Sequence, residues 1–131
     1  MWFDIDPGSS MPIYLQLVNK IREAVAREIL EPGHRMPTVR ELASRLTINP
    51  NTIAKAYQRL EREGVIITMG SRGSFISGSL PGHSNEEGRQ IIAGLLDKLL
   101  VEAFHRGVNV EEVKRLIEEG LQKWEREKEG N

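Results

Sequence analysis

The feature that most constrains the fold is a pair of short helical patterns separated by only a few residues. The first covers residues 38–46. The second covers residues 49–63 and lies within the stretch INPNTIAKAYQRLEREG. In both patterns apolar side chains recur three and four positions apart, which is the spacing of one buried stripe on a helix. Two helices joined by so short a turn predict a helix-turn-helix.

The residues at the ends of the second pattern indicate where that helix begins and ends. Asn49 is expected to cap it and Pro50 to fill its first position. Gly64 is expected to end it in a left-handed conformation. One polar side chain is enough for the cap, so Asn51 and Thr52 need another explanation.

Two signals define the segments before this pair. Residues 11–30 carry an apolar residue at every fourth position up to Ile29, which predicts a first helix capped by Ser10. Thr38 and Glu41 have the spacing of a capping box at the start of the next helix, in which two backbone amides are satisfied reciprocally.

A β-hairpin is expected directly after the second helix of the pair. Within residues 65–77, β-branched residues stand on both sides of a glycine-containing loop at residues 70–73. A helix-turn-helix followed by such a hairpin has the order of a winged helix. Residues 1–78 are therefore expected to form a winged helix-turn-helix domain.

The C-terminal part of the chain predicts an αα-hairpin behind a linker. The run GSLPGHS is rich in Gly, Pro and Ser, so residues 79–84 are assigned to a linker and residues 85–131 to a two-helix domain. Ser84 and Glu87 form a second capping box, and Asn109 is expected to cap the last helix. The expected fold class is thus mainly α with a small β-hairpin wing.

The two C-terminal helices carry more apolar surface than a lone hairpin buries. Val108 and Val113 have the spacing of a hydrophobic staple at the start of the last helix. A hairpin of about 50 residues is marginally stable by itself, so its apolar face must cover the first domain or a second copy of the hairpin. The second copy is favoured, because a linker precedes the hairpin and two-fold dimers are the commonest oligomers.

The net charge of −1 conceals an uneven distribution. Residues 35–72 hold seven basic and three acidic side chains, whereas residues 80–131 hold eight basic and eleven acidic ones. A basic middle beside an acidic tail indicates that the middle binds an anion. Ordinary solvated surface charges are the alternative.

The second helix of the pair has a polar face suited to nucleic acid. Opposite its apolar stripe lie two amides, an ammonium and a guanidinium, with Thr52 at the flank; such groups hydrogen-bond base edges and phosphates in a major groove. The start of the helix also offers the positive end of its dipole and free backbone amides, which favour phosphate. A solvated outer face is the alternative. The four residues of the face are Asn51, Lys55, Gln58 and Arg62.

Two arginines outside this helix extend the candidate surface. Arg40 lies in the first turn of the preceding helix, within reach of a phosphate or a base edge unless it pairs with a nearby Glu. Arg72 stands at the hairpin tip beside Gly73, where the backbone can approach a partner closely and an arginine can enter a minor groove. For the tip, the alternative is a plain turn with a solvated arginine.

The composition excludes or disfavours several other classes of site. The chain has no cysteine, so disulfides, thiolate zinc sites and cysteine catalysis are excluded. His34, His83 and His105 lack the spacing of metal ligands and no catalytic constellation stands out, so no metal, cofactor or enzyme activity is expected. No apolar run reaches the ~18 residues of a membrane span, and the N-terminus lacks the features of a signal peptide. A cytoplasmic protein without membrane contact is expected.

Taken in order, these motifs resemble those of a known family. The stretches PGHRMPTVRELASRLTINPNTIAKAYQRLEREGVI and SRGSFIS are similar to the DNA-binding domain of GntR-type bacterial transcription regulators. FDIDPGSSMPIYLQLVNKIREAV looks like that family's N-terminal helix with its lead-in. The NPNT motif and the short C-terminal part resemble the YtrA-like subgroup.

The resemblance implies a homodimer that binds an inverted-repeat operator in double-stranded DNA, usually as a repressor, and that dimerises through its C-terminal helices. Many relatives outside this subgroup carry arginine where this chain has Pro50 or Ala54, so their base contacts and operator sequence do not carry over to these positions. The short tail has no room for the ligand-binding domain of larger relatives, which leaves a small-molecule effector open. The family's DNA contacts map to Arg40, Asn51, Thr52, Lys55 and the wing around Arg72 and Gly73.

Two other functions fit the same basic face. A winged helix can dock an acidic protein partner, and an architectural DNA binder would use the face without sequence preference. Undetectable DNA binding even at low salt favours the first. A specificity ratio below about 10³ favours the second.

Overall fold

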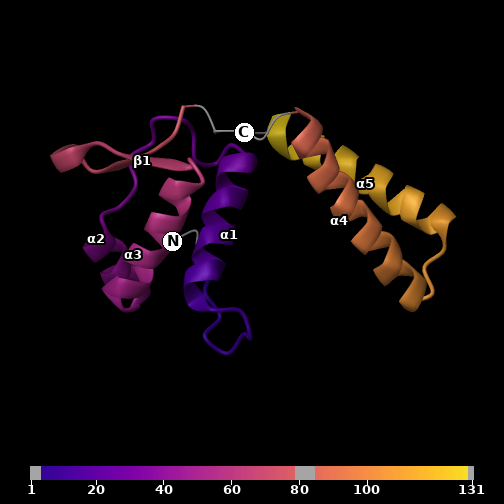
Figure 1. The fold of residues 1–131 in the computed structure, drawn as a ribbon, viewed down its shortest axis with the longest axis horizontal. Helices are drawn as coiled ribbons and strands as arrows, with labels where there is room; N and C mark the ends of the chain where they lie inside the picture. Colours follow the sequence, from indigo (N-terminus) through magenta and orange to yellow (C-terminus); the bar gives the residue numbers. More distant parts are fainter. Residues whose placement is uncertain (1–3, 79–84, 130–131) are drawn as a thin grey trace. The chain divides into compact units, whose positions relative to one another are not determined.

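The chain is mainly helical, with one β-hairpin (Figure 1). The computed structural model describes residues 4–78 and 85–129. Contacts divide the chain into two compact units, Met1–Pro81 and Gly82–Asn131. The predicted linker 79–84, with the Ser84 cap, lies outside the described residues. The elements are α1 (Ile13–Ala26), α2 (Val39–Leu46), α3 (Pro50–Arg62), β1 (Ile66–Thr68), a 3₁₀ turn (Gly70–Arg72), β2 (Ser74–Ile76), α4 (Asn85–His105) and α5 (Val110–Glu129).

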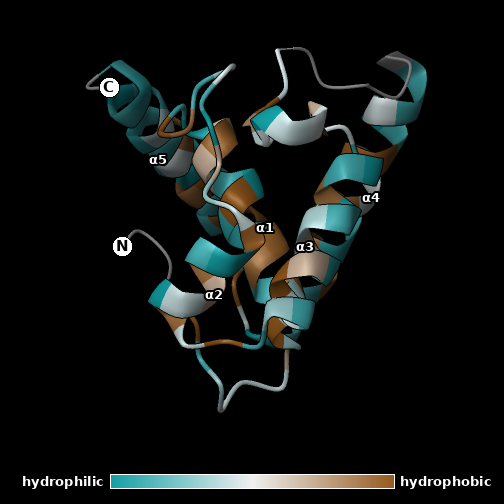
Figure 2. Cartoon of the chain, turned by 90° about the vertical axis from the view of Figure 1, so that its left-hand side faces the viewer, coloured by the Kyte–Doolittle hydropathy of each residue, from teal (hydrophilic) through white to brown (hydrophobic). Residues whose placement is uncertain are grey.

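The first unit is built around a core shared by α1, α2, α3 and the hairpin. α3 packs against both α1 and α2. Figure 2 shows hydrophobic segments of α1 in brown and hydrophilic segments in teal along the outer turns of α2 and α3. The predicted stripe of α3 is confirmed, since all four of its members are buried. These are Ile53, Ala56, Tyr57 and Leu60.

The prediction for the first helix is wrong at both ends. α1 begins after Pro12, without a side-chain cap, and it ends at Ala26. Glu28 then takes a left-handed conformation (φ 63°), which lets the next two amides return to the carbonyl of Ala24. This reversal rotates the chain, so Leu30 is 2% exposed and Ile29 is 57% exposed. The repeat of apolar residues at every fourth position therefore does not extend to Ile29 in the structure.

α2 and α3 begin as their capping residues predict. The Glu41 amide donates to Thr38 Oγ1 (3.1 Å), and the Asn51 amide donates to Asn49 Oδ1 (2.8 Å). Only half of the capping box forms in the part of the chain that the structure describes. The Glu41 carboxylate lies 3.9 Å from the Arg45 guanidinium instead of reaching the Thr38 amide.

The C-terminal end of α3 is closed by a glycine motif. Gly64 has φ 74°. Its amide donates to Glu61 (3.0 Å), and the Val65 amide donates to Leu60 (2.9 Å). This pair of bonds is the Schellman pattern, and it confirms Gly64 as the helix stop.

The predicted hairpin is confirmed, and it gains a third extended segment. β1 and β2 are antiparallel, with Ile66 opposite Ile76. The segment before α2 pairs with the other edge of β2 through a bridge between Arg35 and Phe75, and the Met36 amide donates to Ser74 (2.8 Å). β2 is therefore paired on both edges, and the turn of the hairpin projects beyond the helices at the left of Figure 1.

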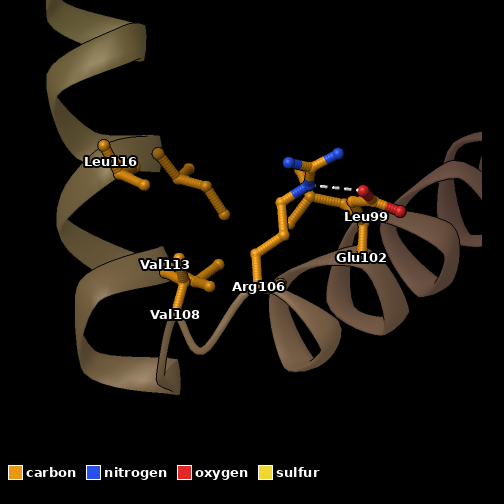
Figure 3. A pocket seen from close by; sticks show the side chains of 8 residues that line it. Leu99, Glu102, Arg106, Val108, Val113 and Leu116 are labelled. Atoms are coloured by element: carbon orange, nitrogen blue, oxygen red, sulfur yellow. Dashed lines mark hydrogen bonds and ion pairs between the residues drawn. The ribbon is translucent and has the colours of Figure 1, made fainter.

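The second unit is an αα-hairpin with almost no core of its own. The Glu112 amide donates to Asn109 Oδ1 (2.9 Å), which confirms Asn109 as the cap of α5. Val108 and Val113 lie side by side at the start of α5, as a hydrophobic staple requires (Figure 3). Among residues 86–129, Val113 is the one buried side chain.

Candidate nucleic-acid interface

The polar face of α3 is open to solvent. Asn51, Lys55 and Gln58 are exposed, and Thr52 is half-buried at the flank. The buried stripe of the helix fixes its rotation, so these side chains point away from the core. Gln58 also borders a shallow hollow, together with Glu61 and Arg62.

The expectation of free backbone amides at the start of α3 is wrong. Pro50 has no amide hydrogen. The Asn51 amide is taken by the Asn49 side chain, and the Thr52 and Ile53 amides donate to the Asn49 carbonyl (3.0 and 3.3 Å). The cap therefore satisfies the first turn internally. Side chains, rather than amides, must supply the hydrogen-bond donors of this surface.

The cations of the first unit fall into two groups. Arg59 is held by Glu63 (Nε–Oε2 3.2 Å), and Arg45 lies beside Glu41. Arg40, Lys55 and Arg72 have no ion-pair partner within residues 4–78 and 85–129. Glu41 is next to Arg40 in sequence, yet it turns to Arg45. The predicted salt-bridge alternative for Arg40 therefore does not form.

Arg40 and the start of α3 border the same hollow. This open depression of about 520 Å³ lies along α2 and the turn into α3. Its lining includes a residue from the first turn of α2 and Pro50, where the exposed face of α3 begins. The residues that line it are Arg40, Ala43, Ser44, Thr47, Ile48 and Pro50.

The wing turn is contacted by Arg35, a residue of the segment before α2 that the sequence did not assign to it. Arg35 Nε donates to the carbonyl of Arg72 (3.4 Å). The same guanidinium lies 3.5 Å from the point where a Cβ at Gly73 would stand. Arg35 therefore stabilises the turn through its guanidinium, while the Arg72 side chain is exposed at the tip of the turn. The basic charge of Arg35 was visible in the sequence, but its pairing with β2 was not.

The described residues contain no group of three or more His, Asp or Glu side chains that could hold a metal ion. In the same ranges, no helix is long and apolar enough to cross a membrane.

The comparisons with known proteins agree on one family. Residues 13–76 match the model for bacterial regulatory proteins of the gntR family. The chain is 41% identical over 115 residues to the HTH-type transcriptional repressor YtrA of Bacillus subtilis (strain 168), covering 88% of each protein.

Solved structures support the same assignment. The chain resembles a transcriptional antiterminator from Listeria monocytogenes EGD-e, with 38% identity, a TM-score of 0.78, and coverage of 93% of this chain and 91% of that one. The DNA-binding domain of AraR, solved in complex with operator ORX1, matches with 25% identity and a TM-score of 0.51, over 56% of this chain and 92% of that one. The chain therefore belongs to the gntR family of bacterial regulatory proteins, as a YtrA-like, DNA-binding transcription regulator.

Proposed function

We propose that the chain is a homodimeric repressor, without enzymatic activity, that recognises an inverted-repeat operator. The observation that carries this proposal is the exposed face of α3, whose cation Lys55 has no ion-pair partner among the described residues. Each protomer would place α3 in a major groove, with the half-sites about one helical turn apart. Such a repressor would work in the cytoplasm, where its operator is.

The side chains of this surface suit different parts of a DNA duplex. The amides of Asn51 and Gln58 match the paired donor and acceptor of an adenine edge, and the Lys55 ammonium matches the acceptors of guanine. Thr52, at the flank, would donate its hydroxyl to a base or a phosphate. Arg40, across the hollow from Pro50, is suited to the phosphate backbone or a base edge.

The wing would contact the adjacent minor groove. Arg72 is exposed at the tip and unpaired within the described residues. Arginine is favoured in narrow minor grooves because the negative potential is strongest there. Gly73 allows the turn that presents it. Because Arg35 supports the turn, the wing would enter the complex already formed.

Dimerisation would use the apolar surface of α4 and α5. Twelve large apolar side chains of the described part of this unit are exposed, whereas residues 4–78 of the first unit expose only four. A second copy of the hairpin would therefore match this surface better than residues 4–78 would. The twelve residues are Ile91, Ile92, Leu95, Leu96, Leu99, Leu100, Val101, Phe104, Val110, Leu116, Ile117 and Leu121.

The proposed function assigns a separate role to each of three parts of the chain. Residues 1–78 would bind DNA, residues 79–84 would link the parts, and residues 85–131 would dimerise. The open apolar hollow of about 500 Å³ between Leu99 and Leu116 (Figure 3) would then be covered by the second copy.

Selection of bound sites from a random DNA pool tests the function. We expect enriched sequences with two-fold symmetry. On the selected site, the Arg40→Ala, Lys55→Ala double variant should bind at least tenfold more weakly, since one base-reading contact alone contributes roughly 1–3 kcal/mol. The matched control is Arg45→Ala, Lys98→Ala, which removes the same charge elsewhere and should bind nearly normally.

The other outcomes of this experiment identify the alternatives. Enrichment without any shared sequence would indicate an architectural DNA binder. No binding even at low salt would indicate a protein-interaction module. Equal loss in the double variant and its control would show that net charge, rather than the α3 surface, governs binding.

A further inference from the structure

A tyrosine on α1 holds the central cation of the α3 surface. The Lys55 ammonium lies 4.0 Å from the centroid of the Tyr14 ring. This distance is well within the range of a cation–π interaction, in which the negative face of the ring attracts the charge. Tyr14 lies outside the helix-turn-helix, and nothing in the sequence pattern of α3 points to it.

The Tyr14 ring is held by packing. It is half-buried and packs against the hydrophobic core. In the same turn of α1, the Gln16 side-chain amide donates to the carbonyls of Asp6 and Met11 (2.9 Å each) and accepts from the Asp6 amide (2.9 Å). These bonds hold the lead-in against the turn of α1 that carries Tyr14.

An aromatic ring and a carboxylate bind a cationic side chain in different ways. Glu63 partly neutralises Arg59 and occupies its Nε–H. The ring of Tyr14 attracts Lys55 but accepts no conventional hydrogen bond from it, so the charge is kept and the ammonium can still donate to DNA. A lysine side chain also loses part of its rotamer entropy when it binds. Restraining it beforehand reduces that loss.

We propose that Tyr14 is a positioning residue for DNA recognition, which presents the Lys55 ammonium to the operator in a restricted set of conformations. This inference rests on the proposed function. It extends the recognition surface to α1, and it gives the Gln16 contacts at the start of α1 a role in specificity as well as in folding.

The contact itself is tested in the protein without DNA. A ring face shields nearby protons, so the Lys55 ε-methylene protons should resonate upfield of those of other lysines in NMR spectra. Tyr14→Phe keeps the ring and should keep this shift, and Tyr14→Leu should abolish it. The absence of the shift in the unsubstituted chain would overturn the inference.

The role in recognition is tested by a double-mutant cycle on the selected operator. Tyr14→Leu should lower the ratio of operator to non-operator affinity by about two- to fivefold, the range of an exposed cation–π contact, and Tyr14→Phe should restore it. In a Lys55→Met background, Tyr14→Leu should leave the ratio unchanged. An equal loss in both backgrounds would mean that Tyr14 only supports the fold, which overturns the inference.

The cycle also separates this inference from the proposed function. If the unsubstituted chain binds no DNA, the proposed function fails and the inference fails with it. If the chain recognises its operator and Tyr14→Leu has no effect, the inference alone is overturned.

Discussion

At the scale of single residues, the Tyr57 hydroxyl ties α3 to the segment that leads into α2. It donates to the carbonyl of Pro37 (2.6 Å) from a buried position. Burial raises the pKa of Tyr57 well above its usual value, and the negative charge of Glu41 raises it further. Tyr57 therefore stays protonated in the folded chain at pH values where it ionises in the unfolded chain.

This difference predicts a loss of stability in alkaline solution. The unfolded Tyr57 loses its proton from about pH 10 upward, while the folded one retains it, so the contribution of Tyr57 is complete below pH 10 and falls above it. Tyr57→Phe should cost about 1 kcal/mol at neutral pH, because the Pro37 carbonyl loses its donor. Above pH 10 the variant should lose stability less steeply. Urea unfolding at pH 8 and pH 11 measures both effects, and parallel pH profiles would contradict the prediction.

The wing turn depends on one glycine. Gly73 has φ 105° and ψ −161°, a region that only glycine adopts without strain. Gly73→Ala should therefore cost about 1–3 kcal/mol through backbone strain alone, because the new Cβ would lie at an ordinary contact distance of 3.5 Å from the Arg35 guanidinium. Gly78→Ala is the matched control, because Gly78 has no positive φ and a Cβ there would meet nothing within 4 Å. Equal unfolding midpoints for the two variants would contradict the prediction.

At the scale of elements, the turn between α2 and α3 is strained. Thr47 is β-branched, yet it takes a left-handed conformation (φ 56°). This conformation returns the Ile48 amide to Ala43 (3.0 Å) and brings Ile48 against the core. The hydrophobic contact of Ile48 thus offsets the backbone strain at Thr47.

Relief of this strain should stabilise the winged helix. Thr47→Gly removes the Cβ that disfavours the left-handed conformation, and we expect a gain of up to about 1 kcal/mol. Thr47→Ala keeps a Cβ and should gain much less. Chemical unfolding of the unsubstituted chain and the two variants measures these changes in the free energy of unfolding. An equal gain for Thr47→Ala and Thr47→Gly would show that the β-branch alone causes the strain.

At the scale of the whole molecule, the apolar residues of α4 span more than half of the helix circumference, at least about twice the width of an ordinary buried stripe. One partner helix, α5, covers only part of so wide an arc. Val113 alone is buried within residues 86–129. The hairpin therefore needs a second apolar surface, and this need motivates the proposed dimer.

Charges on this surface should separate the protomers. Ile92→Glu with Leu96→Glu places two carboxylates on adjacent turns of the apolar face, and each lost side chain removes about 1.5–3 kcal/mol of burial. The variant should sediment as a monomer of 14.8 kDa, whereas we expect the unsubstituted chain to sediment as a dimer. Its operator affinity should fall by at least a hundredfold, because two half-sites are no longer bound together.

A matched control adds the same charge to polar positions. Gln90→Glu with Gln122→Glu changes exposed residues on the outer faces of α4 and α5. This variant should remain a dimer and bind its operator normally. A monomeric control would mean that added charge, rather than the apolar face, disrupts assembly, and an unsubstituted monomer at micromolar concentration would rule out the dimer itself.

The sequence by itself determined the elements whose signals are local. The caps Thr38, Asn49 and Asn109, the Gly64 stop and the buried stripe of α3 all lie where their spacing predicted, because each depends on contacts within a few residues. The same periodicity correctly predicted which side of α3 faces solvent. The candidate DNA-binding residues were identified from that face, from Arg40 and from the hairpin tip, and their contacts with DNA stay a prediction.

Only the tertiary structure decided the features that join distant parts of the chain. The reversal at Glu28 replaces Ile29 by Leu30 in the core, since the core accepts one side chain there and the local pattern does not show which. The support of the wing by Arg35 and the contact of Tyr14 with Lys55 also join different elements. Such contacts depend on how helices and strands pack, and no spacing along the chain encodes that packing directly.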